Sequence, residues 1–78
     1  MVARDKLLEQ VRRNLRSDWQ IGDLKTLAAR YGIEWRSPSG SHVIFLPAKG
    51  PILSVPARRP IKPVYVRLFV EMIARVQE

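Results

Sequence analysis

One histidine and a small group of cations are the residues of this chain best suited to chemistry. His42 is the only histidine in 78 residues, and histidine is a side chain type that can both accept and return a proton in catalysis. Arg58, Arg59 and Lys62 lie further along, in a proline-rich stretch. Such cations can offset the charge that grows on phosphoryl oxygens when a phosphodiester is cleaved. Together these residues suggest RNA cleavage without a metal, with His42 as the base that deprotonates a ribose 2′-OH.

The chain lacks the residues that most other kinds of site require. It has no cysteine and seven carboxylates, which do not cluster, so we expect no metal site and no cofactor. There is no glycine-rich phosphate loop, and no histidine–acid pair that could activate a serine. A structural role for His42 stays open, as a histidine at the start of a strand that is hydrogen-bonded to a neighbour.

The charge balance points to a polyanionic partner. Fourteen Lys and Arg against seven Asp and Glu give a net charge of +7, and ten of the cations are arginine. Arginine binds phosphate and carboxylate through paired hydrogen bonds, which favours RNA or an acidic protein. The cations gather in residues 4–16 and 58–67. The first group falls largely on a helix face, where solubility alone is the alternative explanation.

Hydrophobic periodicity predicts the elements that must position these side chains. Helices are predicted over residues 5–16 and 23–31, and Gly32 fits a left-handed C-terminal cap. Strands are predicted at 33–36, 42–46 and 52–55. Pro63 fits the first turn of a last helix, in which the helical spacing of Tyr65 and Phe69 assigns both to the core. This pattern predicts an α+β fold in the order α-α-β-β-β-α, with a three-stranded antiparallel sheet packed against helices.

Size and composition predict one domain, residues 1–78, because domains typically run from about 50 to 250 residues. The longest aliphatic and aromatic run is residues 43–46, whereas a membrane-spanning helix needs about 20 apolar residues, so we expect no membrane partner. The lack of cysteine fits a reducing compartment such as the cytoplasm. Trp19 and Trp35 could stack on bases, but we expect Trp35 in the core.

A run of residues in the strand region resembles a known family. The chain contains the run Gly40-Ser41-His42-Val43-Ile44-Phe45, which is followed by Leu53-Ser54-Val55-Pro56 and by a basic loop, residues 56–62. This arrangement is similar to the HicA family of toxin messenger-RNA interferases. The resemblance implies a double-stranded-RNA-binding-domain-like fold over a core of residues 23–76, with residues 5–16 as an added helix.

The same resemblance implies a function. His42 would be the catalytic residue of an RNA endonuclease toxin that cleaves mRNA, inhibits translation and is neutralised by a HicB-type antitoxin. Gly40 and Ser41 would shape the turn that presents His42, and Lys62 matches the family's lysine after the third strand.

Some positions depart from the family pattern. Val43 stands where the family often has a second histidine, and Ala57-Arg58-Arg59 replaces a histidine often found after the Val-Pro step. Two other functions stay open for this reason. One is a non-catalytic RNA-binding module of the same fold, which would bind by shape through phosphate and 2′-OH contacts. The other is an assembly protein that docks an acidic partner on its basic surface.

Overall fold

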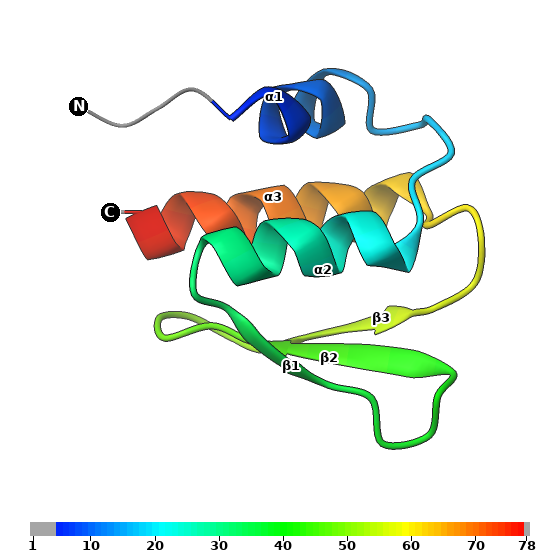
Figure 1. The fold of residues 1–78 in the computed structure, drawn as a ribbon, viewed down its shortest axis with the longest axis vertical. Coiled ribbons are helices and arrows are strands. Elements are labelled where there is room, and N and C mark those ends of the chain that lie inside the picture. The colour runs from blue at the N-terminus through cyan, green and yellow to red at the C-terminus, as the bar shows by residue number, and fades with distance from the viewer. Residues whose placement is uncertain (1–4, 78) are drawn as a thin grey trace.

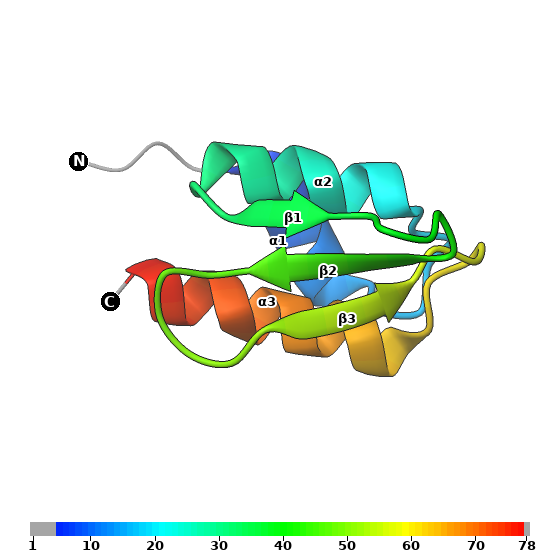
Figure 2. The ribbon, with the colours of Figure 1, turned by 90° about the horizontal axis from the view of Figure 1, so that it is seen from below.

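The structure is a computed structural model that describes residues 5–77. Its elements are α1 (Lys6–Arg13), α2 (Ile21–Arg30), β1 (Glu34–Arg36), β2 (His42–Leu46), β3 (Leu53–Pro56) and α3 (Pro63–Gln77). The strands form one antiparallel sheet in the order β1-β2-β3 (Figures 1 and 2). The α+β class and the order α-α-β-β-β-α predicted from the sequence are confirmed.

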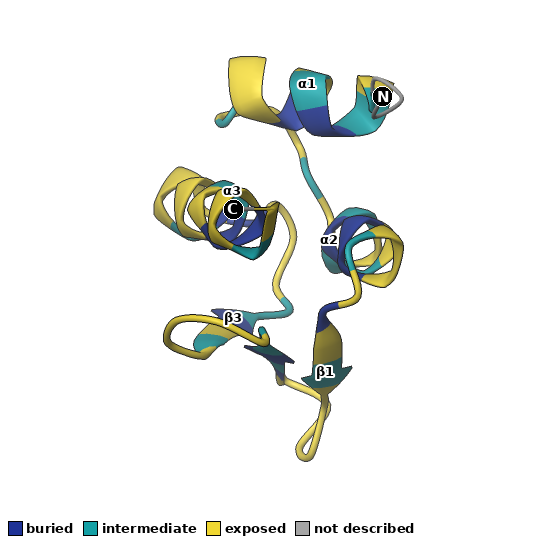
Figure 3. Ribbon diagram, turned by 90° about the vertical axis from the view of Figure 1, so that its left-hand side faces the viewer, coloured by how far each residue is buried: buried dark blue, intermediate teal, exposed yellow. Residues whose placement is uncertain are grey.

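The elements are arranged in three layers. Helices α2 and α3 lie side by side over one face of the sheet, and α1 lies on top of them, on the side away from the sheet (Figure 3). The opposite face of the sheet is covered by no other element of the described chain (Figure 3). Among residues 5–77, no helix has both the length and the apolar character needed to cross a membrane.

Strand register decides which side chains enter the core. Phe45 stands opposite Trp35 of β1, and Val43 stands opposite Val55 of β3. Val43, Phe45 and Val55 are at most 1% exposed because they face the helices. Since successive side chains alternate between the two faces of a sheet, His42 falls on the face opposite to Val43. The alternation expected for β2 is therefore confirmed.

Aromatic rings fill the space between the sheet and α3. The rings of Phe45 and Phe69 are tilted by 60° with centroids 4.8 Å apart, an arrangement that the aromatic quadrupoles favour. Trp35 is half-buried and its ring centroid lies 6.5 Å from that of Phe45, so this tryptophan packs against the core, as expected. The buried residues are Leu8, Val11, Leu24, Leu27, Ala28, Ile33, Val43, Phe45, Val55, Ile61, Val66, Phe69, Met72 and Ile73.

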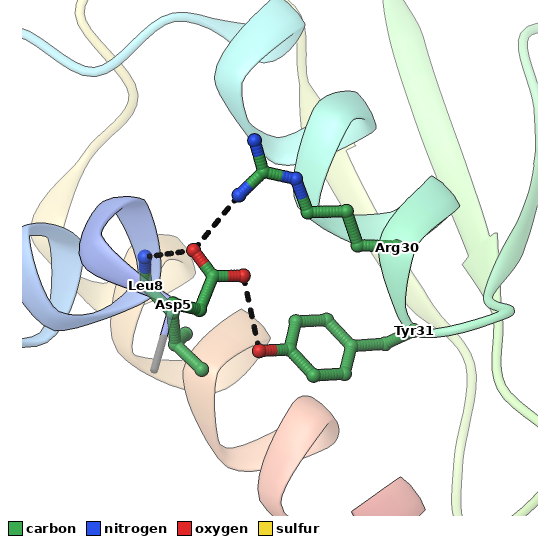
Figure 4. Close-up of polar contacts among 4 residues, drawn as sticks. All are labelled: Asp5, Leu8, Arg30 and Tyr31. Atoms are coloured by element: carbon green, nitrogen blue, oxygen red, sulfur yellow. Dashed lines mark hydrogen bonds and ion pairs between the residues drawn. The ribbon is translucent and has the colours of Figure 1, made fainter. Parts of the chain in front are cut away.

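One carboxylate fastens α1 to α2 (Figure 4). Asp5 accepts a hydrogen bond from the Leu8 backbone N–H at 3.2 Å, from the Arg30 guanidinium at 2.8 Å and from the Tyr31 hydroxyl at 3.1 Å. Burial raises the pKa of Asp5, but the hydrogen bonds and the charge of Arg30 outweigh it and hold the pKa below its ordinary value of 3.8. Burial, together with the hydrogen bond to Asp5 and its negative charge, raises the pKa of Tyr31.

The first helix is shorter than predicted. It ends at Arg13 rather than at residue 16, because Asn14 leaves helical geometry and its side-chain amide donates to the Gln10 carbonyl at 3.1 Å. Asparagine competes with the helix for backbone partners in this way. The Trp19 indole N–H then donates to the Asn14 carbonyl at 2.6 Å. The chain after α1 is thus a folded turn that carries Leu15 and Arg16.

The second helix begins earlier than predicted. It starts at Ile21 rather than at residue 23, because Gln20 and Asp23 form a reciprocal cap in which the Gln20 N–H donates to the Asp23 carboxylate at 2.9 Å. The predicted cap at its other end is confirmed. Gly32 has a φ of 70°, and the Ile33 N–H donates to the Ala28 carbonyl at 2.8 Å.

Three strand boundaries differ by one residue from the prediction, one in β1 and two in β3. β1 begins at Glu34 rather than at Ile33, whose N–H is used by the helix cap. β3 spans Leu53–Pro56 rather than 52–55. Proline is tolerated there because β3 is an edge strand, which can spare one backbone donor.

Candidate functional site

A hollow at one end of the sheet brings together most of the predicted site residues. It has a volume of about 440 Å³, and it lies where β2 begins, β3 ends and α3 begins, at the right-hand end of the molecule in Figure 2. It is lined by Gly40, Ser41, His42, Pro56, Ala57, Arg58, Pro60, Lys62 and Tyr65. Of the predicted site residues, Arg59 alone does not line it.

Backbone pairing sets the position of His42 beside the end of β3. His42 stands opposite Pro56 in the strand register, and the Ala57 N–H donates to the Ser41 carbonyl at 2.9 Å. Gly40 has a φ of 78°, a left-handed conformation that a side chain would strain. The turn before β2 and the first residue after β3 are therefore joined, which places the imidazole next to the basic loop.

Serine hydroxyls form a short chain that ends at the imidazole. Ser41 Oγ lies 3.3 Å from Nδ1 of His42 and 3.0 Å from Ser39 Oγ. The Ser37 hydroxyl donates to the His42 carbonyl at 3.3 Å. When Nδ1 carries the ring proton, this N–H donates a hydrogen bond to Ser41 Oγ. Nε2 of the exposed ring then keeps a free lone pair. That tautomer is the one a general base requires.

One buried side chain anchors the basic loop. Ile61 is 2% exposed and its N–H donates to the Trp19 carbonyl at 2.8 Å. Arg58 and Lys62 line the hollow on either side of this anchor. Arg59 is directed elsewhere, since its guanidinium lies 3.9 Å from the Asp18 carboxylate and both side chains are largely exposed. The site thus holds two of the three cations predicted for it.

Tyr65 is a lining residue that the sequence pattern assigned to the core alone. It is half-buried, packs against the core and also lines the hollow from the first turn of α3. The backbone N–H groups of Tyr65 and Val66 both donate to the Lys62 carbonyl, at 3.0 and 3.2 Å, so α3 begins at the hollow. The signal in the sequence is the position of Tyr65 just after Pro63, where a helix starts directly from the basic loop.

The hollow carries positive charge without a compensating carboxylate. No acidic residue lines it, and neither Arg58 nor Lys62 forms an ion pair within residues 5–77. The N-terminus of α3 adds a partial positive charge. Within the same range, no group of three or more His, Asp or Glu side chains is arranged to hold a metal ion. The arrangement can bind an anion and move one proton through His42.

Comparisons with known proteins identify no relative of this chain: no family model, curated protein or solved structure matches it.

Proposed function

We propose that this chain is an RNA endonuclease toxin of the HicA type, which cleaves messenger RNA without a metal ion and is neutralised by a HicB-type antitoxin. The observation that supports the proposal best is the hollow where His42, Arg58 and Lys62 meet, although they lie in different segments of the sequence. Its volume of about 440 Å³ falls within the range of about 300–1,000 Å³ typical of small-molecule sites. A nucleotide unit of an RNA strand therefore fits it.

In the proposed reaction, Nε2 of His42 takes the proton of a ribose 2′-OH, and the 2′-oxygen forms a bond to the adjacent phosphorus. The bond between phosphorus and the 5′-oxygen breaks, and the imidazolium returns its proton to that oxygen. The products are a 2′,3′-cyclic phosphate and a 5′-hydroxyl, and His42 is neutral again. Arg58 and Lys62 stabilise the charge that develops on the phosphoryl oxygens.

The positive hollow also suggests how an antitoxin would act. Because no carboxylate lines the hollow, acidic side chains of a partner would find cations free to bind them. Such a partner would compete with the phosphates of RNA for Arg58 and Lys62. Inhibition would then weaken as salt concentration rises.

The test is cleavage of labelled RNA by the purified protein in the presence of a chelator. Wild type should give fragments that end in 2′,3′-cyclic phosphate, and His42→Ala should slow cleavage by about 10²- to 10⁴-fold, the usual contribution of a general base. An RNA with a single 2′-deoxy residue at the cleaved position is the matched substrate control and should resist wild type. Equal cleavage by wild type and His42→Ala would overturn the catalytic assignment. In cells, only wild type should stop growth and deplete messengers.

A non-catalytic RNA-binding module is the second candidate, and one observation favours it. The hollow holds a single imidazole, with no carboxylate and no second histidine to share the proton transfers. A pure binder would retain labelled RNA at low salt, leave it intact and bind equally well after His42→Ala. The appearance of cleavage products that depend on His42 excludes this candidate.

A further inference from the structure

Positive side chains continue beyond the His42 hollow toward the end of α1. A second hollow, of about 260 Å³, is lined by Leu15, Arg16, Pro63, Val64 and Arg67. A third, of about 510 Å³, is lined by Arg12, Arg13, Asn14, Leu15, Arg16 and Ser17. The second hollow adjoins the first through the consecutive residues Lys62 and Pro63, and it adjoins the third through Leu15 and Arg16, which line both. The three hollows therefore follow one another along the surface.

The cations of these hollows have no acidic neighbours among the lining residues. We define the cationic track as the six basic residues that line the three hollows, namely Arg12, Arg13, Arg16, Arg58, Lys62 and Arg67. None of the six forms an ion pair with another residue of the range 5–77, whereas Arg30 is paired with Asp5 and Arg59 with Asp18. Glu9 lines a neighbouring hollow with Arg12 and Arg13, so the track is a line with an excess of positive charge, which attracts an extended anion.

The position of α1 creates this track. Helix α1 lies over α2 and α3 (Figure 3), and the turn that follows it brings Arg16 into one hollow with Arg67 of α3, far away in the sequence. The α1–α2 connection, the start of α3 and the loop before it lie at the same end of the molecule (Figures 1 and 2), and Arg12 and Arg13 lie on the last turn of α1. Helix α1 and the turn after it line no part of the His42 hollow, yet together they supply three of the six cations of the track.

We propose that the cationic track binds the phosphate backbone of a single-stranded RNA substrate that runs from the His42 hollow, across the start of α3, to the end of α1. A strand fits better than a small anion because the cations are spread over three hollows. The exposed apolar side chain of Val64 lines the second hollow together with Arg16 and Arg67, and it offers an apolar surface for a ribose or base. This inference rests on the proposed function, which supplies the strand.

The experiment measures RNA binding on a His42→Ala background, so that cleavage does not interfere. The test variant carries Arg12→Gln, Arg13→Gln and Arg16→Gln together. The control variant carries Lys6→Gln, Lys25→Gln and Arg75→Gln, which remove the same charge at residues that line none of the three hollows. Circular dichroism verifies that both variants are folded. The probes are oligoribonucleotides of about 3 and about 12 nucleotides, because single-strand sites span about 4–16 nucleotides.

We expect the test variant to bind the longer probe about 10- to 100-fold more weakly at about 0.1 M salt. Each lost phosphate contact on a single strand lowers by about 0.7 the magnitude of the slope of log affinity against log salt concentration. For the test variant, the magnitude of that slope should fall by about 2. The control variant should lose far less affinity for the longer probe, and the two variants should bind the short probe equally well. With His42 restored, the test variant should cleave the longer probe with a raised KM, whereas the KM of the control variant should change far less.

The failure of this inference and that of the proposed function are distinguishable. If the test and control variants lose affinity equally, net charge alone explains the result and the track is overturned, even if wild type cleaves RNA. If wild type never cleaves RNA but binds it in a way that depends on these arginines, the track stands and the nuclease fails. Polyglutamate serves as a competing acidic polymer. If the three substitutions weaken its binding and leave RNA binding unchanged, the track belongs to a protein partner and the inference is overturned.

Discussion

Replacing Asp5 by alanine should destabilise the protein by loosening α1, because one carboxylate both caps this helix and holds it to α2. Asp5 accepts hydrogen bonds from the Leu8 N–H, the Arg30 guanidinium and the Tyr31 hydroxyl. Its side chain is only 10% exposed, whereas that of Arg30 is 52% exposed. The three contacts therefore contribute unequally.

The loss can be worked out contact by contact. Removing a helix N-cap costs about 1 kcal/mol. The Tyr31 hydroxyl is part-buried and would lose its acceptor, which costs about 1 kcal/mol. The pair with the half-exposed Arg30 adds less than about 0.5 kcal/mol, since water and salt screen it. The expected loss is about 2 kcal/mol, with α1 and its buried residues Leu8 and Val11 loosened first.

Urea unfolding followed by circular dichroism measures this loss. Asp18→Ala is the matched control, because the Asp18 side chain is 66% exposed and its contact with Arg59 is 3.9 Å long, so it should change the free energy of unfolding by less than about 0.5 kcal/mol. Tyr31→Phe completes a double-mutant cycle, in which a coupling of about 1 kcal/mol to Asp5 is expected. A free energy for Asp5→Ala within about 0.5 kcal/mol of wild type would refute the reasoning.

Four further predictions follow from other parts of the structure. The folded-state pKa of Asp5 lies below 3.8, so its contribution to stability is present above that pH and is lost as the pH falls through the lowered pKa. Asp5→Asn should therefore make the free energy of unfolding less dependent on pH in the acid range. Ser41→Ala should slow RNA cleavage by less than about tenfold, since the hydroxyl only orients His42, whose own loss costs far more. Gly32→Ala, at a φ of 70° with no atom nearby, should cost about 1 kcal/mol in urea unfolding. Ile61→Ala should cost about 2–4 kcal/mol and weaken RNA binding as well, because this buried residue anchors the basic loop; unchanged binding would show that the loop keeps its place without it.

Local sequence signals were enough to predict the elements and their order. Gly32 marks the end of α2 because a left-handed residue is needed there. The alternation in β2 separates Val43 from His42 because side chains in a strand alternate between faces. Helix ends were less predictable. The start of α2 depends on a contact between Gln20 and Asp23. Glutamine is not among the preferred N-cap residues, and Asp23 lies at the third position of the helix rather than at its N-cap.

The composition of the site was only partly predictable, because it depends on contacts between distant segments. Arg58 and Arg59 are adjacent and chemically identical, yet one lines the hollow while the other lies near Asp18. The path of the loop decides between the two arginines, and this path is held by the burial of Ile61 and by its backbone hydrogen bond to Trp19. Periodicity assigned Tyr65 to the core, and it cannot show that a half-buried ring also lines a hollow. No regular spacing in the sequence predicts that Arg16 and Arg67 line the same hollow.

In the proposed cleavage reaction, the presence of a single imidazole would make the cationic track important for catalysis as well as for binding. A general base accounts for an acceleration of about 10²- to 10⁴-fold. Among the described residues that line the hollow there is no carboxylate and no second histidine to accelerate the proton transfers further. In that reaction the remaining acceleration would come from the stabilisation of phosphoryl charge by Arg58 and Lys62, and from the alignment of the 2′-oxygen with phosphorus and the leaving oxygen. A strand held only in the His42 hollow could rotate, whereas one also held at the end of α1 could not. Loss of the α1 arginines should therefore raise KM for long RNA, and short RNA should be a poor substrate even for wild type, because it cannot reach the contacts that align it.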